Sequence, residues 1–159
     1  MKRIGNLYHR IISLHNLREA DRRARKGKSH QPGVRLFEKD REVLLEQLHE
    51  TLRSQNYHTS SYTIFTIREP KEREIFRLPY YPDRIVHHAI MNVLEPIFLA
   101  HFTADTYSCV KGRGIHGAAN ALKRALRDEA GTTYCLKLDI RKFYPSINHQ
   151  ILKNLLHRK

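Results

Sequence analysis

The sequence predicts an α+β fold in which helices outnumber strands. Apolar residues recur at intervals of three and four in several long segments, which is the spacing of one helix face. Two short runs rich in β-branched and aromatic residues flank the tetrapeptide PKER, residues 70–73, and predict a β-hairpin. A further run, TTYCLKLD at residues 132–139, alternates apolar and polar side chains, which is typical of a half-buried strand.

Two helices are expected before the hairpin. The first has an apolar face made by Ile4, Leu7, Tyr8, Ile11 and Ile12, and it is expected to run on through EADRRARKGK until Gly27 and then Pro32-Gly33 stop it. The second begins at Leu36 or Phe37 and has an apolar face made by Leu44, Leu45, Leu48 and Leu52.

Three helices are expected after the hairpin strands SYTIFTIRE and EIFRLPY. Asp83 is a candidate N-cap for a helix that reaches Phe98, and Pro96 should end or kink that helix. The second helix covers residues 115–126. The third follows the strand at residues 132–139 and has an apolar face made by Ile147, Ile151, Leu152, Leu155 and Leu156.

The charge balance favours a polyanionic partner. Lys and Arg number 29 against 16 Asp and Glu, so the formal net charge is +13. A small basic domain gains free energy from the counterions that each phosphate contact releases, so nucleic acid is the leading partner class. An anionic membrane surface is the alternative, although no apolar run approaches the roughly 20 residues of a spanning helix.

Other features of the sequence argue against a signal peptide, a disulfide framework and a zinc site. No continuous apolar stretch follows the basic N-terminus, so we expect no signal peptide. The two cysteines, Cys109 and Cys135, form neither a CxxC metal motif nor a disulfide framework, so a cytoplasmic location is expected. The chain has 11 histidines, but His87 and His88 are adjacent and no Cys-His cluster appears, which favours surface or packing histidines over zinc ligands.

The stretch LKLDIRKFYPSINH, residues 136–149, is the most informative part of the sequence about function. A carboxylate at the end of a strand, here Asp139, can present a hard oxygen ligand to Mg²⁺. Taken alone, the same aspartate favours an ordinary strand-turn-helix in which it only caps the turn.

The whole stretch closely resembles motif A of reverse transcriptases, especially the bacterial group of group II intron, retron and diversity-generating retroelement enzymes. The resemblance implies that Asp139 is a catalytic aspartate and metal ligand, and that the carbonyl of Ile140 completes the coordination. It places Arg141 and Tyr144 at the nucleotide, where the Tyr144 ring would exclude a 2′-hydroxyl. A plain core aromatic is the alternative for Tyr144.

Two further blocks resemble the same family in the same order. Residues 67–98 are similar to the fingers hairpin and its following helix, which implies that Lys71 and Arg73, with Arg77 as a further candidate, contact the nucleotide triphosphate. The neighbouring glutamates allow a merely solvated hairpin. Residues 105–122 resemble a loop-helix that meets template and nucleotide. There Lys111 and Arg113 would supply charge, and the flanking glycines would permit close approach.

A basic cluster precedes these blocks. It lies where related enzymes carry an N-terminal extension that contacts template RNA, and a solvated helix end is an equal alternative. Its candidate RNA-binding residues are Arg22, Arg23, Arg25, Lys26 and Lys28. The expected domains are an N-terminal helical extension at residues 1–33, fingers at 34–131, and the beginning of a palm at 132–159. Within the family, the sequence of residues 71–89 is more similar to the retron-like and diversity-generating branch.

The resemblance implies the N-terminal part of an RNA-directed DNA polymerase. Its partners would be an RNA template, a DNA primer and deoxynucleoside triphosphates, and its cofactor Mg²⁺, with Mn²⁺ as a substitute. A metal pair needs carboxylates from more than one strand, yet no YxDD motif is present and neither Asp nor Glu follows Asp139. The chain by itself is therefore expected to be inactive, and an incomplete palm would expose apolar surface through which it could dimerise.

Two rival hypotheses remain at this point. A non-catalytic RNA-binding module would keep the charge and lose the chemistry, so it would bind RNA in a salt-sensitive way without metal. A relative of RNA-dependent RNA polymerases is the second rival, and Tyr144 argues against it because such enzymes accept a ribose.

Overall fold

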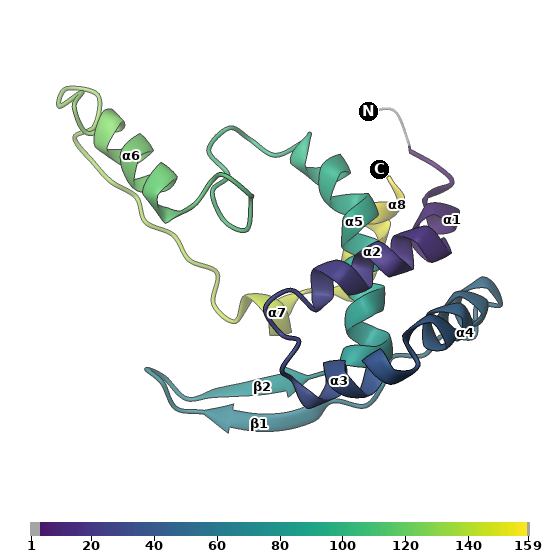
Figure 1. Ribbon diagram of the computed structural model, residues 1–159. Helices are drawn as coiled ribbons and strands as arrows, with labels where there is room; N and C mark the ends of the chain where they lie inside the picture. The colour runs from purple at the N-terminus through teal and green to yellow at the C-terminus, as the bar shows by residue number, and fades with distance from the viewer. Residues whose placement is uncertain (1–3, 159) are drawn as a thin grey trace. The chain divides into compact units, whose positions relative to one another are not determined.

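The computed structural model describes residues 4–158 and confirms the α+β class (Figure 1). The chain forms two compact units, one from Asn6 to Phe98 and another made mainly by the residues from Leu99 onward. These two units are defined by the contacts within each of them. The domain boundaries expected near residues 33 and 131 are based on sequence motifs instead, so they stay predictions.

The N-terminal helical segment is divided in two. Helix α1 (Leu7–Ile12) ends at Ser13, and α2 (Leu14–Ala24) begins directly after it. The prediction of one continuous helix was wrong, because Ser13 has extended backbone and its hydroxyl accepts a hydrogen bond from the Asn16 N–H at 3.3 Å. A side-chain cap of this kind begins a new helix with a new axis.

The second predicted helix is also divided. Helix α3 (Pro32–Lys39) is followed by α4 (Arg41–Arg53), and Asp40 between them has φ −124° and ψ 30°, outside the helical region. Pro32 begins α3 at its first turn, where a missing N–H costs nothing, so it starts a helix rather than only stopping one.

The β-hairpin is confirmed. Strands β1 (Thr63–Ile67) and β2 (Arg73–Arg77) pair antiparallel and are each shorter than the predicted runs. In the register, Thr63 lies opposite Arg77 and Phe65 opposite Ile75. Because side chains alternate across a strand, these four residues share one face of the hairpin.

The exit from the hairpin is an irregular helical turn, Tyr80–Arg84, that leads into α5 (Ile85–Leu99). Asp83 does not act as the expected N-cap. Its Oδ1 instead accepts hydrogen bonds from the Tyr57 hydroxyl at 2.7 Å and the Ser60 N–H at 3.1 Å. Pro96 lies inside α5, which continues to Leu99, so Pro96 does not end the helix.

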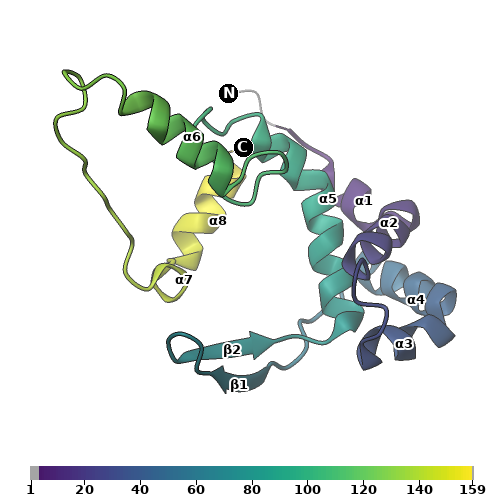
Figure 2. The same cartoon turned by 60° about the vertical axis from the view of Figure 1, so that its left-hand side comes forward.

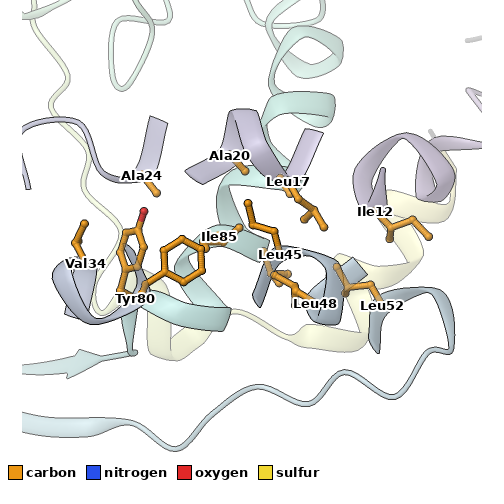
Figure 3. Close-up of a cluster of buried hydrophobic side chains, with 13 residues drawn as sticks. Ile12, Leu17, Ala20, Ala24, Val34, Leu45, Leu48, Leu52, Tyr80 and Ile85 are labelled. Carbon is orange, nitrogen blue, oxygen red and sulfur yellow. The ribbon is translucent and has the colours of Figure 1, made fainter. Parts of the chain in front are cut away.

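The core of the Asn6–Phe98 unit joins its helices and the turn before α5 (Figure 3). Phe37 packs edge-to-face on Tyr80, with ring centroids 5.5 Å apart, and stacks on Tyr81 at 5.3 Å. The buried members of the core are Ile12, Leu17, Ala20, Ala24, Val34, Phe37, Leu45, Leu48, Leu52, Tyr80, Ile85, Val86 and Ala89.

A carboxylate lies within this core. Asp21 on α2 is fully buried, and its oxygens receive Arg41 Nε at 2.7 Å and Arg25 Nη2 at 3.0 Å. The Tyr80 hydroxyl also donates to Asp21 Oδ1 at 2.5 Å. Burial and the Asp21 carboxylate both raise the pKa of Tyr80 above its usual range. The cluster therefore ties α2, the start of α4 and the turn before α5 together.

The second unit contains α6 (Ile115–Ala125), α7 (Phe143–Ser146) and α8 (His149–His157). No side chain is buried among residues 99–158. Helix α8 begins later than predicted, because the Asn148 side chain accepts hydrogen bonds from the N–H groups of Gln150 and Ile151.

The predicted strand at residues 132–139 is not formed. The segment is irregular and runs as a long connection from α6 to α7 (Figure 2). Its apolar side chains Tyr134, Leu136 and Leu138 are 94%, 82% and 80% exposed. A strand needs a hydrogen-bonded neighbour, and the two strands of residues 4–158 pair only with each other.

Candidate nucleic-acid interface

A groove with a volume of about 950 Å³ lies in the Asn6–Phe98 unit. We call it the hairpin groove. One wall is the base of the hairpin, with Ser61, Thr63, Phe65, Ile75, Phe76 and Arg77. The remaining lining comes from the connection between α2 and α3, from the first turn of α3, from the exit of the hairpin and from the first turn of α5, namely Lys28, Gln31, Gly33, Leu78, Pro79, Tyr80, Arg84, His87 and His88.

The charged side chains that line the hairpin groove are all basic. Lys28, Arg77 and Arg84 are permanent cations, His87 and His88 can become cations, and no Asp or Glu is among the described residues that line it. Within residues 4–158, none of the three permanent cations forms an ion pair with a carboxylate. These charges are therefore available to an anionic ligand.

Local structure explains how these residues converge. Arg84 ends the turn before α5, and His87 and His88 follow it by three and four positions in the first turn of α5, so the three side chains lie on neighbouring positions of one helix face. Arg77 is the last residue of β2, and the register places it on the same hairpin face as Phe65. Lys28 follows α2 and is brought in by the packing of that helix.

His88 is half-buried in this positive environment. Burial lowers its pKa from the ordinary value of 6.5, and the neighbouring charges of Lys28, Arg84, Arg23 and His87 lower it further. Protonation of His88 is thus disfavoured in the free protein, because the ring is half-buried and because cations lie on the elements packed against it.

The histidines were missed as site residues in the sequence. Their adjacency argued against a metal site, and among the described residues no group of three His, Cys, Asp or Glu side chains is placed to hold a metal ion. The signal that could have found them is the spacing R-x-x-H-H directly after the hairpin, which gathers three basic groups on one helix face.

The predicted hairpin residues lie at the other end of the strands. Lys71 is in the turn between β1 and β2, and Arg73 is the first residue of β2, opposite Ile67. Both are exposed, and neither lines the hairpin groove. Their contact with a triphosphate stays a prediction.

Several cations of the N-terminal cluster have carboxylate partners. Arg22 and Arg23 contact Glu19 at 2.7 and 2.9 Å, and their hydrogen bonds lower the pKa of Glu19 to about 2. Arg25 contacts Asp21 and Glu38. Lys26 is exposed, and of the five predicted residues only Lys28 reaches the hairpin groove.

The candidate residues of the second unit do not converge on a centre. Arg113 donates hydrogen bonds to the carbonyls of Thr103 and Ala104, both at 3.2 Å. These bonds hold together the two ends of the loop at residues 103–113. Lys111, Asp139, Ile140, Arg141 and Tyr144 are all exposed.

The metal site predicted at Asp139 stays a prediction, because the described residues do not bring further ligands to it. Asp139 and the Ile140 carbonyl lie in the irregular segment before α7, and the described residues supply no second and third carboxylate beside them. A centre for a metal pair needs several oxygen ligands, and residues 4–158 do not bring such a set together at Asp139.

Taken together, the fold and the groove define a basic α+β protein with a cation-lined surface. No protein-family model matches the chain. It is 29% identical over 123 residues to nuclear intron maturase 4, mitochondrial, of Arabidopsis thaliana, covering 77% of this chain and 15% of that protein. It is 25% identical over 80 residues to nuclear intron maturase 1, mitochondrial, of the same plant, covering 50% and 11%.

A bacterial protein is similar over a shorter stretch. Protein YkfC of Escherichia coli strain K12 is 26% identical over 84 residues, covering 52% of this chain and 22% of that protein. The chain thus spans less than a quarter of the length of each of these relatives. The matches support a relationship with intron maturases, which are proteins related to reverse transcriptases.

No helix in residues 4–158 combines the length and the apolar character that crossing a bilayer requires.

Proposed function

We propose that this chain is an RNA-binding module of the reverse transcriptase and maturase type, and that the hairpin groove contacts the RNA phosphate backbone. The observation that carries the proposal is the lining of the groove: within residues 4–158 it has three permanent cations that form no ion pair, and it has no carboxylate. The net charge of +13 and the similarity to proteins named intron maturase support it.

The chemistry of the groove suits phosphate recognition. Arg77 and Arg84 can each offer a planar fork of N–H donors to phosphate oxygens, and Lys28 adds a point charge. Contacts of this kind release counterions from the nucleic acid, so the affinity should fall steeply with salt. They need no metal ion, and binding should persist when divalent cations are chelated.

The double variant Arg77→Ala/Arg84→Ala is expected to bind a short RNA roughly tenfold more weakly or worse, and its plot of log affinity against log salt should be less steep by about 2. Fluorescence anisotropy over a salt series measures both quantities. The control is Arg10→Ala on α1, which removes a charge from an exposed helix outside the groove. Equal losses for the double variant and the control would overturn the proposal, because the binding would then depend only on overall charge.

RNA binding is also expected to strengthen as the pH falls. A phosphate in the groove would stabilise the His88 imidazolium, so the pKa of His88 should be higher in the complex than in the free protein. The gain is complete below the free-protein pKa and is lost as the pH rises through the pKa of the complex. Lowering the pH from about 8 to about 6 should tighten binding by up to roughly tenfold for this one proton.

The variant His88→Gln tests the source of this effect. It should flatten the pH profile, whereas His9→Gln, which changes an exposed histidine on α1, should leave the profile intact. Circular dichroism at each pH confirms that the protein stays folded. A profile that is equally steep in His88→Gln would assign the proton to another group.

Nucleotidyl transfer is the second candidate function, and the stretch at residues 136–149 favours it. In a protein that supplied further carboxylates, Asp139 and the Ile140 carbonyl would bind Mg²⁺ or Mn²⁺. Arg141 and Tyr144 would meet a deoxynucleoside triphosphate at the end of a DNA primer. Those partners, the bacterial branch and a dimer through the exposed apolar side chains of the second unit remain predictions.

A further inference from the structure

The outer edge of the hairpin is unpaired. Strand β1 pairs with β2 on one side, and among residues 4–158 no other strand lies along its second side. Figure 1 and Figure 2 both show β1 as the strand of the hairpin that lies farther from α5. Alternate N–H and C=O groups of β1 therefore point away from β2, where a further strand can bind them.

The edge of β1 lacks the residues that commonly protect an open edge strand. Residues 59–67 contain no Lys, Arg, Asp or Glu, and no Pro or Gly. Strand β2 differs, because Arg73, Glu74 and Arg77 are three of its five residues. Proteins usually place charges or prolines on an open edge to prevent pairing, so β1 is the edge of this hairpin that is suited to it.

Both faces of β1 have accessible apolar side chains. Ile64 is 57% exposed on one face, and Phe65 and Ile67 are 42% and 38% exposed on the other. A strand added at this edge would cover part of these side chains on both sides of the sheet. Because a two-stranded hairpin is marginally stable, such an addition would also stabilise the hairpin itself.

The charges of the hairpin favour a second copy of this chain as the added partner. The chain has a formal net charge of +13, so two copies repel each other overall. Residues 68–74 at the hairpin tip are neutral in sum, with three cations and three anions, namely Arg68, Lys71, Arg73, Glu69, Glu72 and Glu74. Two copies can therefore meet along β1 without adding repulsion at the contact.

We infer that β1 pairs antiparallel with β1 of a second copy, in a register centred on Phe65. A twofold axis perpendicular to the sheet relates the two strands, and this register overlaps all five residues of each strand. Phe65 then lies opposite Phe65 of the second copy, and Thr63 lies opposite Ile67. Beyond the strand ends Arg68 lies opposite Tyr62, which allows a cation–π contact. No like charges face each other in this register.

The symmetry also decides how the two hairpins are arranged. A twofold axis perpendicular to the sheet keeps each face on its own side, so the faces with Phe65 and Ile75 point the same way in both copies. The result is a four-stranded sheet in the order β2-β1-β1-β2. Each copy contributes one short strand to the contact, so we expect a weak dimer that depends on protein concentration.

Sedimentation velocity of the nuclease-treated full chain, over a micromolar to millimolar concentration series, measures this association. We expect a monomer–dimer equilibrium that strengthens as salt is added, because salt screens the repulsion between two basic copies. Bridging by residual nucleic acid would give the opposite salt dependence. A monomer throughout the series would overturn the inference.

A charge placed at the centre of the register provides the specific test. Phe65→Lys and Phe65→Glu each bring two like charges together and remove the contact between the two rings, so each should weaken self-association by roughly tenfold or more. An equimolar mixture of the two variants should restore association, because opposite charges then meet. Phe76→Lys is the matched control. It adds the same charge at an exposed aromatic position of β2, and association should stay near the wild-type level.

The mixing experiment separates a lost contact from a folding defect, because a hairpin that failed to fold would not recover in the mixture. If the mixture stays monomeric, or if Phe65→Lys and Phe76→Lys weaken association equally, the inference is overturned. Association that persists unchanged in Phe65→Lys would use another surface and would overturn it as well. None of these measurements involves RNA, so their outcome is independent of the proposed function.

Discussion

Replacing Asp21 by asparagine is expected to lower the free energy of unfolding by about 3 kcal/mol. Asp21 is fully buried and holds two arginines from different elements, Arg25 and Arg41, together with the Tyr80 hydroxyl. The NH₂ group of asparagine donates hydrogen bonds and cannot accept them. It would face guanidinium groups that are also donors only, so the hydrogen bonds made there by the carboxylate oxygen would be lost. Both arginines are partly exposed, so water compensates some of the loss, and the expected cost lies at the lower end for a broken buried pair.

Urea unfolding followed by circular dichroism measures this effect. The midpoint should fall while the slope stays constant, because the surface that unfolding exposes is unchanged. Glu19→Gln on the same helix is the matched control. Glu19 also contacts two arginines, Arg22 and Arg23, but those side chains are exposed and solvent screens the pairs. Its midpoint should barely move, and similar shifts for the two variants would contradict the structural role of Asp21.

Replacing Asp83 by alanine is expected to loosen the hairpin more than the helices. Asp83 is fully buried, and its Oδ1 holds the Tyr57 hydroxyl and the Ser60 N–H in the connection that leads into β1. The hairpin itself is two-stranded, and such a hairpin is marginally stable without support. Losing the acceptor for both donors should cost about 2–3 kcal/mol, concentrated where the hairpin joins the unit.

Hydrogen exchange shows which segments of the protein lose stability in Asp83→Ala. Amides of β1 and β2 should exchange about ten to a hundred times faster in Asp83→Ala, while amides of α4 should change less. Tyr57→Phe removes one of the two donors and should give an intermediate effect. Because the hairpin forms a wall of the groove, RNA affinity should fall as well. Unchanged hairpin protection in Asp83→Ala would show that other contacts position the strands.

The effect of Asp83 should depend on pH. Burial opposes its ionisation, but hydrogen bonds from Ser60 and Tyr57 outweigh burial and hold the pKa of Asp83 below its usual value. Burial, together with the hydrogen bond to Asp83, raises the pKa of Tyr57 to about 12. The stabilisation from Asp83 is therefore present at neutral pH and is lost as the pH falls through the acidic range, where wild type and Asp83→Ala should converge.

Local patterns in the sequence were sufficient for much of the secondary structure. The hairpin was predicted because two β-rich runs flank a turn, and such pairing needs only neighbouring residues. The apolar faces of α4 and α5 followed from helical spacing. The breaks at Ser13 and Asp40 were missed, because the apolar period continues across each of them and only the cap and the packing decide where one axis ends.

The segment at residues 132–139 shows the limit of the same reasoning. Its alternating pattern is strand-like, but a pattern cannot supply the neighbouring strand that its backbone groups need. The site residues show a second limit. Lys28, Arg77 and His88 are far apart in the chain, and no spacing rule brings them to one groove.

The α+β class, the hairpin and the strongly basic character could be predicted from the sequence, because they depend on local periodicity and on a sum of charges. Which cations are free of a carboxylate partner depends on how the chain folds. The Glu19 pairs follow helical spacing, whereas Arg41 is held by a carboxylate 20 residues away, and Arg77 and Arg84 have no carboxylate partner within residues 4–158. A charge is available to a ligand only where folding brings no opposite charge to neutralise it.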